Sequence, residues 1–222
     1  NDNLGLGLTK MTLVMSVLLI AALVFQFRAR RYVPGIYWLA VVLISVVGTL
    51  ITDNLVDNFG VSLVVSTTIF AVALAVTFIA WYASERTLSV HTIVTSKREG
   101  FYWAAILFTF ALGTASGDLL AEKLSVGYWQ SALIFAAIIA LVTLAHFRLG
   151  LNAIAAFWIA YILTRPLGAS LGDYFSQKPA DGGLGLGTVI TSGIFLTTIL
   201  VVVSYLGRQQ QRQLSGAAAA EG

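Results

Sequence analysis

The chain has 222 residues, of which 58% are hydrophobic and only 10% are Asp, Glu, Lys or Arg. A soluble domain of this length needs far more polar surface to cover its core, so the composition excludes an ordinary globular protein. The absence of cysteine excludes disulfides, thiolate metal sites and cysteine nucleophiles. The formal net charge is only +3, and the basic residues lie in short loops, so no nucleic-acid partner is indicated.

Seven hydrophobic segments predict transmembrane helices, because each approaches the roughly 20 residues that span a hydrocarbon layer of about 30 Å. In chain order they cover residues 10–27, 35–55, 61–82, 101–121, 129–147, 150–173 and 188–206. None alternates in polarity as the strands of a membrane barrel do. The predicted fold is therefore all-α, a polytopic helical bundle in the membrane. Residues 207–222, rich in Gln, Ala and Gly, predict a disordered cytoplasmic tail, natural or added for expression.

Basic residues gather at one end of these segments. The opposite end has only Lys10, Lys123, Arg165 and Lys178. The positive-inside rule makes the arginine-rich end cytoplasmic. We therefore expect a multi-pass protein of the bacterial cytoplasmic membrane with its C-terminus inside. The carboxylates show the reverse bias, since most lie toward the outer end: Asp2, Asp53, Asp57, Asp118, Glu122, Asp173 and Asp181.

A pattern of Trp, Gly and Asp occurs three times at constant spacing. Trp38, Trp103 and Trp158 each precede a glycine by ten residues, and each glycine precedes an aspartate by five. The three glycine-to-aspartate segments read GTLITD, GTASGD and GASLGD. Because each unit contains two spans, the copies are parallel repeats related by an axis along the membrane normal.

This repeat predicts the domain organisation. A single transmembrane domain over residues 1–206 divides into units of about 1–34, 35–98, 99–149 and 150–206. The opening NDNLGLGL matches the segment from Val56, which places Asp2 at the position of Asp57. Four units are therefore expected, the first incomplete, with its first helix upstream of residue 1. A native start at residue 1 is the competing interpretation.

The Gly-x4-Asp cores, the segment ILTRPLGAS (residues 162–170) and the later GGLGLG (residues 182–187) resemble a known family. It is the bacterial membrane-protein repeat family called domain of unknown function 347, often labelled "membrane-anchored protein". The resemblance covers nearly the whole chain and implies an eight-span protein of four repeats. Repeats of the family often carry Glu directly after the motif glycine, where this chain has Thr49, Thr114 and Ala169. The resemblance implies no activity.

The carboxylates are the first candidates for an ion site. Asp53 with Asp57, and Asp118 with Glu122, are four residues apart and share a helix face if the helix continues. Ionisable residues at membrane depth are costly and usually line a polar cavity. Converging carboxylate oxygens favour hard cations, so Asp53, Asp118 and Asp173 are candidate ligands of a divalent metal ion such as Mn²⁺, as substrate rather than resident cofactor. The alternative is that these aspartates are hydrated helix ends.

Small residues predict close helix packing. Gly113 with Gly117, and Gly168 with Gly172, form GxxxG, and Gly48 is followed by a threonine four residues later. Such spacing lets helix backbones approach closely in lipid. These five glycines are therefore expected to pack helices and to bring the aspartates toward a neighbouring helix.

Arg165 lies inside a predicted span, eight residues before Asp173. We expect it to form an ion pair with the carboxylates, either as a fixed counter-ion or as a built-in cation that a substrate ion displaces. A snorkelling or bundle-locking arginine is the alternative. Thr164, beside it, is a further candidate for binding an ion or substrate within a span.

Other residues indicate no catalytic chemistry. Trp38, Trp103 and Trp158 lie near the starts of their spans and predict an interfacial aromatic belt. His91 and His146 are far apart in the sequence, so a zinc or copper site is not expected. Without a nucleophile–base pair or an HExxH motif, the chain is not expected to be an enzyme.

Two functions stay open. The first is a small membrane transporter or channel-like protein for a cation, because repeated helices place acidic residues at one face of the membrane. The second is a non-catalytic scaffold or accessory subunit of a larger membrane complex, in which the acidic rim docks a partner. The lipid bilayer is the expected partner in both, and a homo-oligomer is compatible with either.

Overall fold

The computed structural model describes residues 7–29 and 32–220. Within them every regular element is helical, and seven helices are long and apolar enough to cross a membrane. This confirms the predicted all-α, membrane-spanning fold and its seven spans. The predicted equivalence of Asp2 and Asp57 lies outside the described residues.

Short connections join the seven helices. These are α1 (Gly7–Arg28), α2 (Pro34–Asp53), α3 (Leu63–Glu85), α4 (Ser96–Asp118), α5 (Tyr128–Leu149), α6 (Ala153–Ser176) and α7 (Gly187–Ala220). A single π-helical turn extends α2 over Asn54–Asn58, and another extends α4 over Leu119–Lys123. Single 3₁₀ turns at Val90–Thr92 and Pro179–Asp181 lie in the connections after α3 and α6.

Two boundaries differ from the prediction by five residues or more. α4 begins at Ser96 rather than at residue 101, because the Thr95 hydroxyl caps it by accepting a hydrogen bond from the Arg98 amide at 3.3 Å. At the other end of the chain, α7 continues to Ala220, so the tail predicted to be disordered from residue 207 is helical there. Its Ala, Gln, Arg and Leu residues have high helix propensity, which carries the helix beyond the apolar span.

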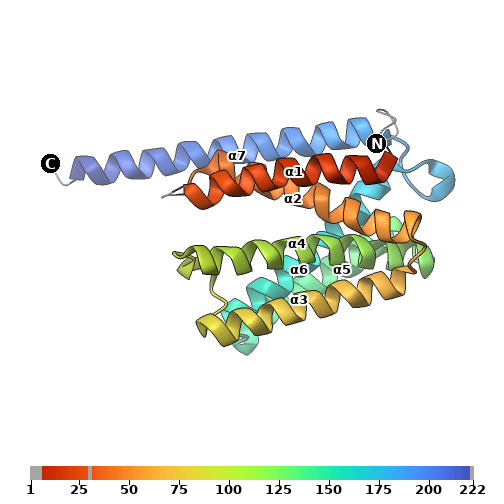
Figure 1. Ribbon diagram of the computed structural model, residues 1–222, viewed down its shortest axis with the longest axis horizontal. Coiled ribbons are helices and arrows are strands. Elements are labelled where there is room, and N and C mark those ends of the chain that lie inside the picture. Colours follow the sequence, from red (N-terminus) through yellow and green to blue (C-terminus); the bar gives the residue numbers. More distant parts are fainter. Residues whose placement is uncertain (1–6, 30–31, 221–222) are drawn as a thin grey trace.

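The even-numbered helices α2, α4 and α6 form an inner row, with the odd-numbered helices outside it (Figure 1). α4 is central, because it packs against both α2 and α6, whereas α2 and α6 make no extensive contact with each other. On the outside, α1 packs on α2, α3 on α4 and α5 on α6. α7 touches α6 and α2 only lightly.

Chain order and packing are offset by one helix. α3 follows α2 in the chain but packs on α4, and α5 follows α4 but packs on α6. Each of the inner helices α2 and α4 is therefore followed by an outer helix that packs against the next inner helix. The same offset leaves α7 without an inner helix of its own among the described residues, which accounts for its light contacts.

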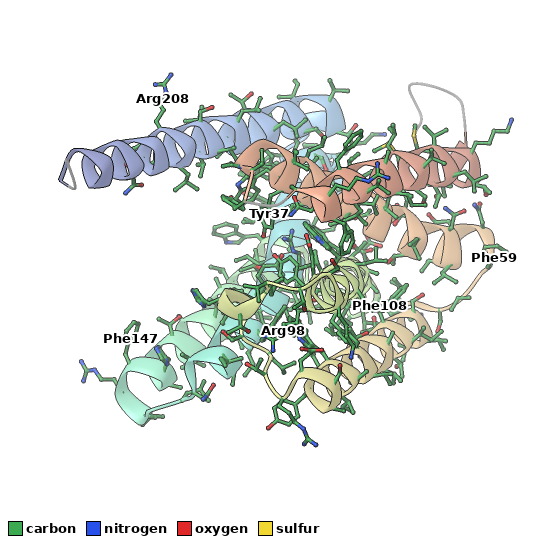
Figure 2. All side chains as sticks on the ribbon, turned by 60° about the vertical axis from the view of Figure 1, so that its left-hand side comes forward. Tyr37, Phe59, Arg98, Phe108, Phe147 and Arg208 are labelled. Atoms are coloured by element: carbon green, nitrogen blue, oxygen red, sulfur yellow. The ribbon has the colours of Figure 1, made fainter. Side chains whose placement is uncertain are left out.

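Large apolar side chains cover the outer surface of the bundle. Phe147 of α5 is 77% exposed and projects from the surface in Figure 2, and Val201 of α7 is 63% exposed. Such a surface is unfavourable in water but matches hydrocarbon, in which lipid tails are as apolar as these side chains. The exposed surface thus supports the membrane assignment independently of helix length.

Glycines allow the inner helices to touch. A Cβ added to Gly48 of α2 would lie 2.7 Å from Cβ of Phe110 in α4, closer than real Cβ atoms pack. A Cβ added to Gly113 of α4 would overlap Arg165 of α6 in the same way, and one at Gly117 would lie 3.3 Å from Cβ of Ala169. Backbones in contact gain dispersion energy that lipid cannot replace, which makes these glycines the points where the row is joined.

The two contacts follow one rule. Each motif glycine meets the residue that stands three positions before the motif glycine of the next inner helix, Phe110 for Gly48 and Arg165 for Gly113. On α6 the equivalent glycine, Gly168, is exposed, and an added Cβ there meets nothing within 4 Å. Gly168 therefore packs no inner helix, in contrast to the prediction, because no further inner helix follows α6 among the described residues.

The rest of this α6 face is also open. Ile44 and Thr109, four residues before their motif glycines, are buried, but the equivalent Thr164 is exposed. Gly172 meets only the ring of Phe195 in α7, 3.8 Å from an added Cβ. We call Thr164, Gly168 and Gly172 the open stripe.

Two of the motif tryptophans lie in the core rather than in an interfacial belt. Trp103 and Trp158 are only 3% and 4% exposed. Trp158 meets Trp81 of α3 edge to face at 5.8 Å between ring centroids, and Trp103 lies 5.6 Å from Tyr37. The predicted belt is therefore wrong for these two, because the inner helices turn the rings into the bundle. Aromatic pairs of this kind contribute about 0.5–1.5 kcal/mol each beyond their burial.

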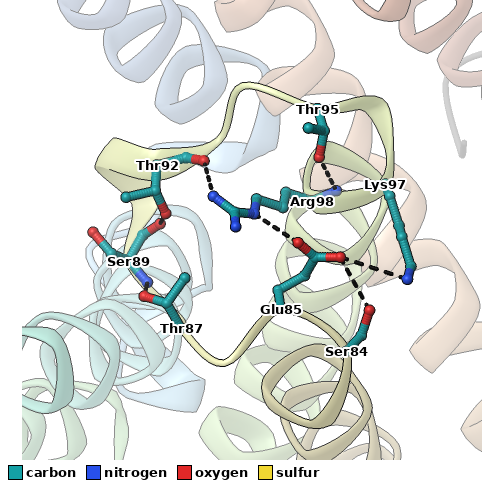
Figure 3. Close-up of polar contacts among 8 residues, drawn as sticks. All are labelled: Ser84, Glu85, Thr87, Ser89, Thr92, Thr95, Lys97 and Arg98. Carbon is teal, nitrogen blue, oxygen red and sulfur yellow. Dashed lines mark hydrogen bonds and ion pairs between the residues drawn. The ribbon is translucent and has the colours of Figure 1, made fainter.

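Polar contacts fix the connection between α3 and α4 (Figure 3). Glu85, the last residue of α3, pairs with Nε of Arg98 at 2.8 Å and with Nζ of Lys97 at 3.5 Å. Arg98 also donates from Nη1 to the carbonyl oxygen of Thr92 at 2.8 Å. The end of α3, the turn that follows and the start of α4 are thus held as one unit.

The glycine contacts predict opposite effects for one substitution at two equivalent positions. Gly113→Ala should lower the Tm in detergent, because the new Cβ overlaps Arg165 and overpacking costs about 1–3 kcal/mol. Gly168→Ala is the matched control, and it should leave the Tm unchanged or raise it. The new Cβ there meets open space, and removing a helical glycine favours folding by roughly 0.5–1 kcal/mol. Equal shifts in the two variants would contradict the packing.

Candidate functional site

The three repeat aspartates lie at one end of the inner row. Asp53 and Asp118 are the last α-helical residues of α2 and α4, and Asp173 lies in the last turn of α6. All three are half-buried. We call Asp53, Asp118 and Asp173 the acid layer. Because the helices α2, α4 and α6 run in the same direction, the repeat brings equivalent positions to one level.

One turn below the acid layer, polar side chains join two of the inner helices. The hydroxyls of Thr49 and Thr114, which directly follow their motif glycines, are hydrogen-bonded at 3.1 Å. Residues four apart share a helix face, so this contact directs Asp53 and Asp118 toward the same interior. The third equivalent, Ala169, adds no polar group at this level.

The acid-layer side chains are carboxylates of like charge, and further carboxylates, Asp57 and Glu122, stand four residues after Asp53 and Asp118. The ion pairs within the described residues all involve Glu85, at the opposite end of the bundle. The acid layer therefore gathers like charges without a basic partner.

Asp57 and Glu122 extend the acidic surface outward. Both lie in the π-helical turns and are exposed, unlike the half-buried aspartates four residues before them. The π-helical turn has i→i+5 hydrogen bonds, so residues four apart no longer lie on the same face as they would in an α-helix. In each predicted pair the aspartate is therefore half-buried and the carboxylate four residues later is exposed. Glu122 accepts a hydrogen bond from the Tyr128 hydroxyl at 3.2 Å. These two carboxylates are therefore solvent-exposed neighbours of the acid layer rather than members of it.

The acid layer is not a metal cage in this structure. Among the described residues, no three His, Asp or Glu side chains are grouped so that they could hold one metal ion. Packed helix axes are about 8–10 Å apart, whereas ligand oxygens must lie within about 2–2.6 Å of a shared ion. The predicted metal ligands Asp53, Asp118 and Asp173 therefore stand as separate carboxylates.

Arg165 stacks on aromatic rings instead of pairing with a carboxylate. Its guanidinium carbon lies 3.3 Å from the ring centroid of Phe110 in α4, and its Nη2 donates to the Tyr161 hydroxyl at 3.4 Å. Nε is buried without a hydrogen-bond partner. The predicted ion pair with Asp173 is absent, because helical side chains lean toward the helix N-terminus, which carries Arg165 toward Tyr161 and away from Asp173. Thr164, on the open stripe, donates to the Tyr161 carbonyl oxygen at 2.6 Å.

A polar cluster that sequence reasoning missed lies beside the acid layer. The amide of buried Asn54 donates to the Thr12 hydroxyl at 2.7 Å and to the Leu50 carbonyl oxygen at 2.8 Å, and its oxygen accepts from Asn58 at 2.8 Å. The Thr9 hydroxyl donates to the same oxygen at 3.2 Å. The signal in the sequence was an asparagine directly after the first repeat aspartate, where the later copies have Leu119 and Tyr174. This cluster attaches α1 to the π-helical turn that follows Asp53.

A comparison with known protein families finds the same repeat. A family model described as Repeat of Unknown Function (DUF347) matches residues 36–87, 101–151 and 156–212. The chain belongs to this family. Each matched segment contains one inner helix and the outer helix that follows it, so the DUF347 unit is the α2–α3, α4–α5 or α6–α7 pair. No curated protein and no solved structure matches the chain.

The surroundings of Arg165 predict how its substitutions rank. Arg165→Met should keep the Tm close to that of the wild type, since replacing a buried charge that has no carboxylate partner by an apolar side chain is often neutral or stabilising. Arg165→Lys should lower stability by about 2 kcal/mol, because lysine keeps the charge but loses the planar stacking on Phe110. Thermal unfolding in detergent ranks the two. A larger loss for Met than for Lys would show that the positive charge itself has a partner.

Proposed function

We propose that this membrane-spanning DUF347 protein conducts or carries a cation across the bacterial cytoplasmic membrane, as a small transporter or channel-like protein without enzymatic activity. The supporting observation is the acid layer, in which half-buried Asp53, Asp118 and Asp173 lie at one end of the inner row and none takes part in an ion pair among the described residues. Carboxylates within a membrane bundle are costly unless an ion, a partner or water compensates them. A cation supplies that compensation.

The separation of the carboxylates favours a cation that keeps part of its water shell. Mg²⁺, for example, dehydrates reluctantly and is usually bound by one or two carboxylates together with several waters. A layer of single carboxylates suits such an ion, and Mn²⁺ and Mg²⁺ are the first candidates. Exposed Asp57 and Glu122 raise the local concentration of cations before they reach the layer.

Arg165 has an opposing effect in this proposal. It lies eight residues from Asp173, which is about 12 Å along the axis of α6 at 1.5 Å per residue. Its positive charge repels a cation that passes beyond the acid layer, so passage requires this side chain to move or to be screened. The C-terminus lies on the cytoplasmic side in the proposed orientation, because the apolar parts of the outer helices are followed there by arginines, Arg28, Arg86, Arg148 and Arg208.

The proposal predicts cation flux that depends on the acid layer. The full chain in proteoliposomes, with a Mn²⁺-quenched dye inside, should show dye quenching when Mn²⁺ is added outside. Asp118→Asn and Asp173→Asn should each slow the initial rate about tenfold, the change that corresponds to 1.4 kcal/mol of lost attraction. Asp181→Asn, an exposed aspartate in the 3₁₀ turn after α6, is the matched control and should keep the wild-type rate.

Elution volume and helical content must be unchanged in each variant. An equal effect of Asp181→Asn would reduce the role of the acid layer to general surface charge. Absence of flux for Mn²⁺, Mg²⁺, Ca²⁺ and monovalent cations would overturn the proposal in favour of a scaffold or accessory subunit, in which the same acidic end docks a partner.

A further inference from the structure

Arginines lie near the ends of the apolar parts of the outer helices, at the side of the bundle opposite to the acid layer. Arg28, Arg86, Arg148 and Arg208 follow or lie near the ends of the apolar parts of α1, α3, α5 and α7, and all four are exposed. Arg86 differs from the others in its surroundings. It stands in the left-handed conformation (φ 58°) that ends α3, and it lines two hollows on the outer surface.

The two hollows adjoin each other along α3. The larger, of about 540 Å³, lies between the last turns of α3 and the start of α6, where Trp158, Ile159 and Ile162 line it. The smaller, of about 430 Å³, includes Ile79 and Ala83 of α3. Both hollows share the ridge Phe78, Tyr82 and Arg86 together with Leu88. Phe78 and Tyr82 are four residues apart on one face of α3, and Arg86 follows at the end of the helix.

The linings divide into an apolar body and a polar end. Phe78, Leu88 and the isoleucines of α3 and α6 surround the body of the hollows. Arg86, after the end of α3, contributes the positive charge, and Thr87 and Asn152 add polar groups to the larger hollow. Two adjoining apolar hollows that share one cation match the form of a diacyl phospholipid, which has two tails and one phosphate. We propose that this site binds one anionic phospholipid, with a tail in each hollow and the phosphate on Arg86.

Arg86 is free to meet a phosphate. The neighbouring basic side chains Lys97 and Arg98 are both engaged by Glu85 (Figure 3), whereas no ion pair within the described residues involves Arg86. At the start of α6 the side chain of Asn152 already accepts the amides of Ile154 and Ala155, so the charge that meets a phosphate is that of Arg86. An arginine-rich face meets the anionic leaflet of the membrane, where each basic residue near the surface attracts anionic lipid.

Hydrogen bonds fix the walls of the hollows. Trp158 donates from Nε1 to the Leu88 carbonyl oxygen at 2.8 Å, which fixes the turn after α3 against α6. Arg98 fixes the next part of the same turn through Thr92. A preformed site loses less ordering entropy on binding than one that must assemble, so a lipid that fits it is retained more strongly than lipid elsewhere on the surface.

Lipid titration of the full chain in detergent, followed by native mass spectrometry, tests this site. Phosphatidylglycerol and phosphatidylcholine with identical tails are the probes. The wild type should retain one phosphatidylglycerol about tenfold more tightly than phosphatidylcholine, a ratio typical of one charge-assisted phosphate contact. Arg86→Gln should reduce phosphatidylglycerol to the phosphatidylcholine level, and Arg86→Lys should restore part of the preference.

Matched variants separate the site from general surface charge. Arg148→Gln removes an equally exposed arginine at the end of α5, outside the hollows, and should leave the preference unchanged. Ala155→Trp fills the larger hollow and should weaken the retention of both lipids. Ala83→Trp, at an exposed position of the smaller hollow, should also weaken the retention of both lipids, and it leaves the core unchanged. Equal retention of the two lipids by the wild type, or equal losses in Arg86→Gln and Arg148→Gln, would overturn the proposal. Cation flux is a separate measurement, so either result stands without the other.

Discussion

Backbone contact at two glycines is the constraint on which the rest of the bundle depends. Gly48 admits α4 against α2, and Gly113 admits α6 against α4, at distances that no side chain larger than hydrogen allows. These contacts set the spacing of the inner row, which lets the Thr49 and Thr114 hydroxyls meet at 3.1 Å one turn below the aspartates. In lipid, where apolar side chains gain little by leaving the solvent, such packing replaces the hydrophobic effect as the force that joins helices.

The offset between chain order and packing couples the repeats. α3 belongs to the DUF347 unit that begins with α2, yet it packs on α4 in the next unit, and α5 relates to α6 in the same way. A unit separated from its neighbours would therefore lose the outer face of its inner helix. Repeats in a solenoid depend on their neighbours for the same reason, since one unit alone cannot cover its packing surface. Stability in this bundle is thus shared across unit boundaries, and a weakened contact in one unit affects the next.

Patterns that depend on spacing could be predicted from the sequence, and features that depend on side-chain direction could not. The seven spans followed from length and hydropathy, and the parallel repeat followed from the constant Trp, Gly and Asp intervals. Trp103 and Trp158 stand near the starts of their spans, but whether a ring faces lipid or the core depends on which helices surround it. Arg165 was placed near Asp173 by its position along α6, yet its side chain leans the other way, onto Phe110. The Asn54 cluster needed knowledge of where α1 lies.

The glycine contacts also give the inner row a direction. A glycine of one helix receives a side chain of the next, and the relation is never reversed between the same two helices. Such a contact between two different surfaces is a heterologous interface, and its repetition either closes into a ring or continues as an open row. The two edges of the row are therefore unlike. α6 presents Gly168 with nothing packed against it. α2 presents Ser45, which stands three residues before Gly48 as Phe110 and Arg165 stand before their own motif glycines. A further helix packed between the free edges of α6 and α2 would need two different faces. One face would offer a side chain to Gly168 of α6, and the other would offer a glycine to Ser45 of α2.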